Sequence, residues 1–374
     1  MKKYYNVRDT LADYRFLDEF YEELIKYNGL KKIDVFKELN IPYTSYVRSL
    51  EEVKGSNLEK YFNKLRNKFD IKELTNDTIN EFNKLFNNIL YRMFYFGDKA
   101  DEFIKKLEEY QEYQNELYPF CKLLMMYVRV MDRNYEYWSN ETISISELEP
   151  YAKLFSFSPF MEIYQTLKVL TSKNKLVEFE TRDGFNSDLK DLIYTAYAYN
   201  AYSNRKYELV LYYAGKAKEF LLNSINIKML FSVNLLYLKA LMEIGGYREM
   251  VDIAKQQLIS IYEYNVQSAL KVKTKECLFY AYYALNRYNE FNEIYSINLW
   301  YDHIDLIFLL LFSKRDNAKY NEMLEKYNVD KVSFTENQIN IIDNVILLIE
   351  DVKANNLSKK KELSRLREIL RVIG

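Results

Sequence analysis

The sequence predicts an all-α protein in which a small N-terminal helical domain precedes a long stack of paired helices. Three observations lead to this fold class. The 374 residues include only 8 Gly and 4 Pro, far below ordinary usage, which argues against turn-rich β folds. Apolar residues recur at helical spacing along most of the chain. A polar turn that ends in tyrosine recurs in the second half, which indicates a repeat architecture.

The composition leaves little for catalysis or metal binding. The single histidine, His303, flanks an apolar segment and is expected to be structural. The two cysteines, Cys121 and Cys277, lie in apolar contexts that are typical of buried thiols. The sequence contains no phosphate-binding loop, dinucleotide-binding glycine motif, nucleophile elbow or zinc-protease motif. We therefore expect no catalytic residue, no metal and no cofactor.

The sequence also gives an expectation for the compartment. The lysines at the N-terminus are not followed by an apolar run, so they do not form a secretory signal. The longest apolar run, Leu306 to Phe312, has seven residues, whereas a spanning helix needs about 20. The net charge of −1 gives no overall attraction to acidic lipid. We expect a cytoplasmic protein with no membrane partner.

Residues 1–72 are expected to form a compact helical domain. Helices are predicted over residues 7–27, 31–39, 43–51 and 57–69, from the spacing of their apolar residues. The helix over 31–39 is expected to bury Ile33 and Phe36. Two nine-residue helices joined by a three-residue turn have the spacing of a helix-turn-helix.

Within this domain, residues 28–51 resemble the helix-turn-helix of the phage-repressor (Cro/C1-like) family. The resemblance is carried by Leu30, the Leu39-Asn40-Ile41 turn, the hydroxyl pair Thr44-Ser45, Val47, and the Arg48-Ser49-Leu50-Glu51 exit. The family usually has glycine where Asn40 stands. The resemblance implies that the helix over 43–51 enters the major groove of double-stranded DNA.

A local excess of positive charge supports a DNA-binding role. Residues 26–72 contain 11 Lys or Arg and 6 Asp or Glu, in a chain whose net charge is −1. Cations that neutralise phosphates release counterions and so favour DNA binding. We expect contacts to the major groove from Tyr43, Thr44, Ser45 and Arg48, and phosphate contacts from Lys31, Lys32 and Lys54. The alternative is a helical bundle that only caps the next domain, with its lysines forming an ordinary solvated face.

Residues 78–354 carry the repeated turn. The four clearest copies are Arg205-Lys206-Tyr207, Gly245-Gly246-Tyr247, Asn286-Arg287-Tyr288 and Ala318-Lys319-Tyr320, whose tyrosines are 40, 41 and 32 residues apart. Each copy lies between an apolar helix and an amphipathic helix, and earlier copies are expected at residues 133–136 and 97–100. A helical pair that repeats at this period predicts an α-solenoid.

These units resemble tetratricopeptide repeats, in which a tyrosine opens the second helix of each pair. In that family, the residues twelve, eight and five positions before the tyrosine line a concave groove. The resemblance therefore implies a groove lined by Thr195, Tyr199, Tyr202, Lys239, Met242, Glu276, Tyr280 and Tyr283. The alternative is that these tyrosines only pack between helices.

The C-terminal residues 356–374 are predicted to form a basic amphipathic helix. Ser358 is a plausible N-cap, and leucines at helical spacing alternate with lysine and arginine. We expect this helix to cap the solenoid or to make a dimer contact. The alternative is a helix that lies on a membrane surface.

The combination of a helix-turn-helix and a tetratricopeptide-like α-solenoid resembles the cytoplasmic peptide receptors of Gram-positive bacteria and their phages. These are the Rap, Rgg, NprR, PlcR and PrgX group and the arbitrium receptors. The resemblance implies a homodimeric quorum-sensing transcription regulator controlled by a short signalling peptide in the groove, with Asn87 holding the peptide backbone. Two alternatives stay open: a tetratricopeptide-like adaptor that binds a protein partner without DNA, and a regulator that answers to a small molecule or another protein.

Overall fold

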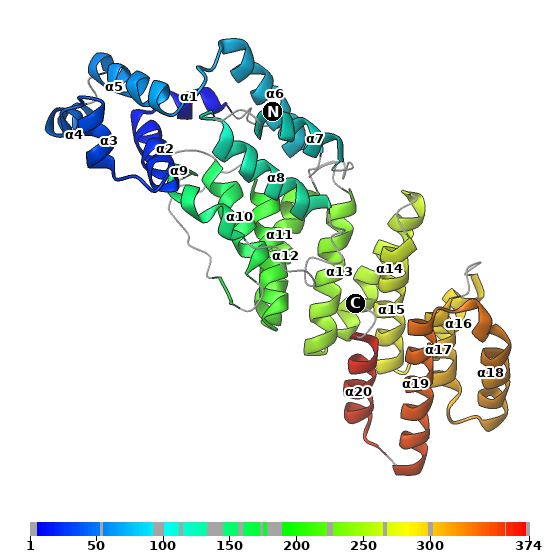
Figure 1. The fold of residues 1–374 in the computed structure, drawn as a ribbon. Helices are drawn as coiled ribbons and strands as arrows, with labels where there is room; N and C mark the ends of the chain where they lie inside the picture. The colour runs from blue at the N-terminus through cyan, green and yellow to red at the C-terminus, as the bar shows by residue number, and fades with distance from the viewer. Residues whose placement is uncertain are drawn as a thin grey trace. The chain divides into compact units, whose positions relative to one another are not determined.

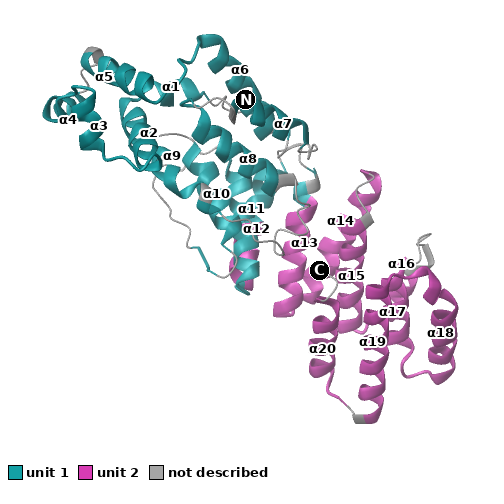
Figure 2. Cartoon of the chain, viewed as in Figure 1, with its two compact units in different colours: residues 1–206, 215–230 teal, residues 207–214, 231–374 magenta. Residues whose placement is uncertain are grey.

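A computed structural model describes residues 6–52, 55–92, 101–111, 115–132, 145–155, 160–172, 175–177, 189–222, 227–264, 268–297, 302–355 and 357–371. Within these ranges the regular elements are all helical, so the predicted all-α class is confirmed for this part of the chain (Figure 1). The chain divides into two compact units (Figure 2). Unit 1 comprises Met1–Lys206 and Gly215–Leu230, and unit 2 comprises Tyr207–Ala214 and Phe231–Gly374.

Unit 1 contains the N-terminal helices and the first part of the predicted repeats. Its elements are α1 (Val7–Leu11), α2 (Tyr14–Tyr27), α3 (Lys32–Glu38), α4 (Tyr43–Glu51), α5 (Gly55–Lys68), α6 (Asn76–Tyr91), α7 (Asp101–Gln111), α8 (Tyr118–Asp132), the short η2 (Ile145–Glu147) and η3 (Glu149–Tyr151), α9 (Ala152–Phe155), α10 (Phe160–Thr171) and α11 (Lys190–Ser203). α12 (Tyr207–Leu221) belongs to unit 2 as far as Ala214 and to unit 1 from Gly215 onward.

Unit 2 contains the later helical pairs and the C-terminal helix. Its elements are α13 (Ile227–Ile244) from Phe231 onward, α14 (Tyr247–Glu263), α15 (Ser268–Ala284), α16 (Tyr288–Ile297), α17 (His303–Ser313), α18 (Asn317–Asp330), the short η4 (Lys331–Ser333), α19 (Glu336–Asn355) and α20 (Lys359–Arg371). α15 packs against α14, α16 and α17, and α19 packs against α17 and α20. These contacts join helices that are one or two elements apart in the chain.

The N-terminal helices follow the prediction with two corrections. α4 begins and ends at the predicted residues. The predicted single helix over 7–27 is wrong, because Asp13 is extended and its carboxylate accepts a hydrogen bond from the N–H of Arg15, which starts α2 as a separate helix. The predicted burial of Ile33 is also wrong: its side chain is 53% exposed, and Val35 and Phe36 form the buried side of α3.

The tyrosine turns are confirmed at the three positions expected to open a helix. Tyr207, Tyr247 and Tyr288 are the first residues of α12, α14 and α16. Two residues before each tyrosine the backbone is left-handed, with φ of 56° at Arg205, 87° at Gly245 and 56° at Asn286. A left-handed residue after a helix ends it and turns the chain. At the fourth turn, α18 begins earlier, behind the N-cap Asp316, and Tyr320 lies inside the helix. The copies expected at 133–136 and 97–100 lie outside the described residues.

The N-terminal helices share hydrogen bonds and an aromatic contact with Glu116 and α8, later in unit 1. The buried carboxylate of Glu116 accepts hydrogen bonds from the hydroxyl of Tyr21 (3.0 Å) and from Nε of Arg66 (2.8 Å). The ring of Phe16 stacks on Phe120 of α8, with centroids 5.4 Å apart. Since Phe16 and Tyr21 lie on α2 and Arg66 on α5, residues 1–72 and α8 share one core.

The two cysteines and the single histidine are all buried. Both cysteines are buried and unbridged, as predicted. His303 is 5% exposed at the start of α17, and its Nδ1 lies 3.1 Å from the side-chain amide of Gln338. Among the described residues, no helix combines the length and apolar character that crossing a membrane requires.

Candidate nucleic-acid interface and inner repeat face

The turn between α3 and α4 is fixed by backbone geometry. Asn40 has a φ of 51°, in the left-handed region that asparagine tolerates better than most residues other than glycine. Its N–H donates to the carbonyl of Lys37 (3.1 Å), and the N–H of Ile41 donates to the carbonyl of Phe36 (2.8 Å). This pair of bonds is a Schellman motif, which ends α3 and aims the chain into α4.

α4 has one exposed side and one buried side. Tyr43, Thr44, Ser45 and Arg48 are exposed, as expected for residues that meet a ligand. Tyr46 is buried, and its ring lies edge-on to Phe36 and Phe62, with centroids 4.8 Å and 6.1 Å away. Arg48 Nε donates to Glu52 Oε1 at 2.8 Å, but the arginine side chain is 76% exposed. Such a surface pair contributes little to stability, so the guanidinium can exchange partners.

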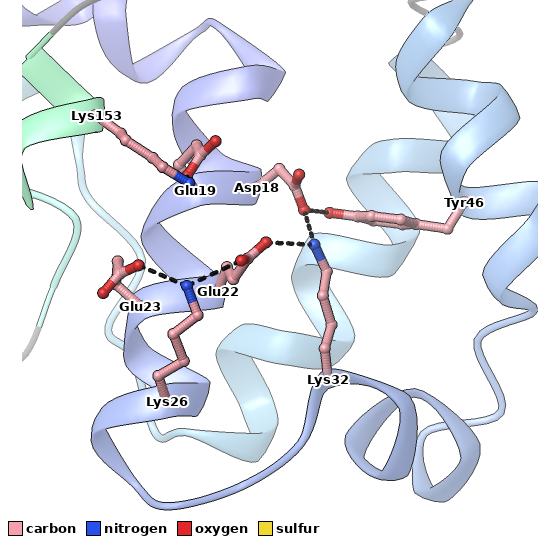
Figure 3. Close-up of polar contacts among 8 residues, drawn as sticks. All are labelled: Asp18, Glu19, Glu22, Glu23, Lys26, Lys32, Tyr46 and Lys153. Carbon is pink, nitrogen blue, oxygen red and sulfur yellow. Dashed lines mark hydrogen bonds and ion pairs between the residues drawn. The ribbon is translucent and has the colours of Figure 1, made fainter. Parts of the chain in front are cut away.

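Lys32 is not an exposed phosphate ligand, which corrects the sequence prediction. Its ammonium lies 2.7 Å from Oδ1 of Asp18 and 3.2 Å from Oε2 of Glu22, both on α2 (Figure 3). The hydroxyl of Tyr46 donates to the same Asp18 oxygen at 2.5 Å. Burial lowers the pKa of Lys32, but the hydrogen bond and charge of Asp18, together with Glu22, raise it above its usual value. Lys32 thus links α3 to α2, and Tyr46 links α4 to the same aspartate of α2.

Other cations of the N-terminal helices are also paired within unit 1. Lys26 contacts Glu22 and Glu23, as Figure 3 shows, and Lys68 contacts Glu38. The charge excess counted in residues 26–72 therefore overstates what the surface offers, because carboxylates of α2 lie outside that window. Lys31 is exposed at the N-cap position of α3, where a phosphate can reach it. Lys54 lies outside the described residues.

The sequence interpretation missed a supporting lysine on α5. Lys64 Nζ donates to the carbonyl oxygens of Leu39 (2.9 Å) and Asn40 (3.2 Å), just beyond the C-terminus of α3. A cation is favourable there because the last carbonyls of a helix carry partial negative charge. Lys64 therefore helps to hold the turn that positions α4. The spacing of Lys64 along α5 gave no signal for this role.

Two of the predicted groove residues of unit 1, Thr195 and Asn87, use their side chains to donate hydrogen bonds to carbonyls of their own helices. The hydroxyl of Thr195 is buried and donates to the carbonyl of Asp191 at 2.7 Å. The amide of Asn87 donates to the carbonyl of Asn83 at 2.8 Å, one turn earlier on α6. Tyr199 and Tyr202 are half-buried on α11. Thr195 is therefore not available to a peptide, which corrects its predicted role.

The predicted groove residues of unit 2 include a buried charged group. Glu276 on α15 is 7% exposed, and Lys239 on α13 is half-buried. Burial raises the pKa of Glu276 to about 7, although the charges of Lys239 and Lys273 act in the opposite direction. The carboxyl is therefore protonated to a much larger extent at neutral pH than an exposed glutamate is. It belongs to the interior of unit 2 and not to an open groove, which corrects the expected peptide contact.

The remaining predicted groove residues are covered by the C-terminal helix. Tyr280 is buried, and its hydroxyl donates to the carbonyl of Leu363 on α20 at 2.9 Å. Tyr283 is also buried, and its hydroxyl donates to the carboxylate of Glu362. The carbonyl of Met242 accepts a hydrogen bond from Arg367 at 3.0 Å. Of the predicted groove positions, Met242, Tyr280 and Tyr283 therefore pack against α20 of the same chain.

These features define what the two surfaces can do chemically. The exposed side of α4 offers hydroxyl and guanidinium donors, the groups that contact base edges and phosphates. Within the described ranges, His, Cys, Asp and Glu side chains form no group of three that could hold a metal. No family model, curated protein or solved structure matches this chain.

Proposed function

We propose that this protein is a DNA-binding transcriptional regulator in which α4 contacts the major groove and the helical repeats bind a regulatory peptide. One observation carries the DNA-binding part. α4 exposes Tyr43, Thr44, Ser45 and Arg48 on one side, while Tyr46 on the other side is fixed by hydrogen bonding and aromatic packing. A short helix that is held rigidly and presents polar side chains is what direct readout of a duplex requires.

The side chains on α4 suit complementary contacts. Arg48 can exchange Glu52 for the O6 and N7 acceptors of a guanine, which a guanidinium binds with two parallel hydrogen bonds. Thr44 and Ser45 can donate to bases or phosphates from the first turn. Lys31, at the start of α3, would hold a phosphate and so set the register of the protein on the duplex.

We further propose that the protein acts as a homodimer. Two copies of α4 would then read half-sites whose centres lie about 34 Å apart, or a multiple of that distance. A peptide that binds the repeats more tightly in one arrangement of the dimer shifts the population toward it, and so changes DNA affinity. The sign of the change depends on which arrangement matches the half-site spacing.

The DNA-binding proposal is tested by selecting duplexes from a randomised library with the full chain. The proposal predicts enrichment of a shared sequence and a loss of that enrichment in the Arg48→Ala variant. Arg287→Ala is the matched control, because Arg287 is another partly exposed arginine close to a carboxylate, with its Nε 3.7 Å from Oε1 of Glu290, and it lies outside α4 and away from α20. A library that shows no enriched sequence after selection would reject DNA readout and favour an adaptor that binds proteins only.

A further inference from the structure

α20 lies on unit 2 as an amphipathic helix with one apolar strip. The leucines of this strip are Leu363, Leu366 and Leu370, which are 8%, 0% and 3% exposed and occupy one side of the helix. Ser358 starts the helix by accepting a hydrogen bond from the N–H of Lys361 at 3.4 Å. α20 thus has a short apolar strip between basic flanks.

The surface beneath α20 is built from the first helices of successive pairs. We call it the α20 face and define it by the side chains of Glu243, Tyr280, Tyr283, Lys314 and Asp351 and the main-chain carbonyl of Met242. These groups lie at the end of α13, on α15, at the end of α17 and on α19. Met242, Tyr280 and Tyr283 are also the residues that the repeat pattern assigned to a peptide groove.

The α20 face has opposite polarity at its two ends. At one end, Tyr283 and Lys314 contact Glu362 in the first turn of α20. At the other end, Arg367 donates to the carbonyls of Met242 and Glu243, both at 3.0 Å, and Arg371 lies 2.6 Å from the Glu243 carboxylate. The face therefore fits a helix that carries an acidic residue first and arginines last, and it fixes the direction of that helix.

The contacts that hold α20 include weak and unfavourable ones. Arg365 and Arg371 are 45% and 42% exposed, so solvent screens their ion pairs. Lys359 lies over the ring of Tyr283, with its ammonium 3.3 Å from the centroid. Burial lowers the pKa of Lys359 to about 8; the charge of Glu362 raises it, and the nearby cations Lys314 and Arg315 lower it. Desolvation of Lys359 therefore opposes docking at this end, and its contact with the Tyr283 ring offsets part of that effect.

We infer that the α20 face is a docking surface for a basic amphipathic helix. In the free chain, α20 is its occupant. The regulatory peptide is a helix of the same kind, and it displaces α20. The identity of the regulatory peptide rests on the proposed function, whereas the docking surface does not. Because α20 is tethered directly behind α19, its effective concentration at the face is high. The incoming peptide must therefore bind the face more tightly than α20 does, or be abundant.

The test uses a fluorescent synthetic peptide of residues 357–371 and the full chain carrying Leu366→Asp, which releases α20 by placing a charge in its buried strip. The peptide is expected to bind this variant at least about tenfold more tightly than it binds the unaltered chain, where α20 competes. Glu243→Arg added to the released variant should weaken binding about tenfold or more, and a peptide carrying Arg371→Glu should restore part of it. Glu263→Arg, at the exposed end of α14, is the matched charge reversal and should have no effect.

Lack of peptide binding to a folded Leu366→Asp variant, or indifference to Glu243→Arg, would overturn the docking surface. If Leu366→Asp does not fold, hydrogen exchange of the unaltered chain decides instead: excess peptide should speed exchange in residues 359–371, and unchanged exchange overturns the inference. Neither readout involves DNA, so the docking surface can be confirmed or refuted independently of the proposed function. For the ligand part, the peptide should change affinity for a selected duplex several-fold while a scrambled peptide does not. Peptide binding without that change would overturn it.

Discussion

Lys31 and Lys32 are adjacent lysines that lie in different environments. Lys31 is exposed at the start of α3, whereas Lys32 contacts Asp18 at 2.7 Å and Glu22 at 3.2 Å. Substitution of each by methionine removes one charge and keeps most of the side-chain volume. Lys32→Met should destabilise the packing of α3 and α4 without removing a phosphate contact. Lys31→Met should remove one phosphate contact without destabilising that packing.

The size of the stability effect follows from the contacts of Lys32. Its loss leaves Asp18 with the Tyr46 hydroxyl but without its counter-ion. A hydrogen bond to a charged group contributes about 1.5–3 kcal/mol when buried. The side chains of Lys32 and Asp18 are still 22% and 21% exposed, so solvent screens the interaction and we expect a loss of about 1–2 kcal/mol. Lys31→Met should stay within about 0.5 kcal/mol of the unaltered chain.

Two measurements separate the roles. Hydrogen exchange in residues 32–51 should be about 5- to 30-fold faster in Lys32→Met, since that is the change in local opening that 1–2 kcal/mol produces. The slope of log affinity against log salt, for a duplex obtained by selection, should fall by about 0.9 in Lys31→Met and be unchanged in Lys32→Met. If Lys32→Met lowers the salt slope and leaves hydrogen exchange unaltered, the structural role assigned to Lys32 is wrong.

Three further predictions follow from single residues. Asn40→Ala should cost about 1–2 kcal/mol because Asn40 has a left-handed φ of 51°, while Asn40→Gly should cost less; thermal unfolding distinguishes them. Glu116→Gln should cost about 1–3 kcal/mol, since Arg66 and Tyr21 lose a buried charged acceptor, and a denaturant midpoint equal to that of the unaltered chain would contradict this. Glu276 has a folded pKa of about 7, above its unfolded value, so stability should fall as pH rises from about 4.5 to about 7. Glu276→Gln should remove that part of the decline, and melting temperatures at pH 5 and pH 8 test this.

The sequence was informative where local geometry decides structure. The turn tyrosines mark helix starts because the chain turns through a left-handed residue two positions before each of them, at Arg205, Gly245 and Asn286. Glycine and asparagine tolerate this φ, whereas the arginine gives no such signal in the sequence. The bounds of α4 follow from the helical spacing of its residues and from Pro42, which directly precedes the helix. Such signals lie within a few residues of the feature they determine, so a single sequence reveals them.

The sequence was uninformative where distant segments meet. The partners of Lys32 are on α2, and nothing in the spacing of Asp18 and Glu22 indicates that they turn toward α3. The single helix predicted over residues 7–27 failed because apolar periodicity continues across Asp13, although its side chain caps a new helix. Local composition cannot reveal either event.

For the predicted groove, the sequence grouped three of the residues correctly but did not reveal which segment contacts them. The resemblance to tetratricopeptide repeats implied that Met242, Tyr280 and Tyr283 line one face, and all three contact the same segment. The identity of that segment could not be predicted, because α20 is distant from these residues in sequence: Arg367 bonds a carbonyl 125 residues before it. An apolar strip on a terminal helix is compatible with packing, dimerisation or membrane contact, and only the fold selects among them.

The central claim is that α4 reads DNA sequence. Its most direct measurement is the affinity of the full chain for the duplex enriched by selection, relative to a scrambled duplex of equal length at the same salt concentration. The claim predicts a ratio of about 10³ or more, which the variant Thr44→Ala/Ser45→Ala/Arg48→Ala reduces by at least tenfold. Equal affinity for the two duplexes, or a ratio that the triple variant leaves unchanged, would contradict it.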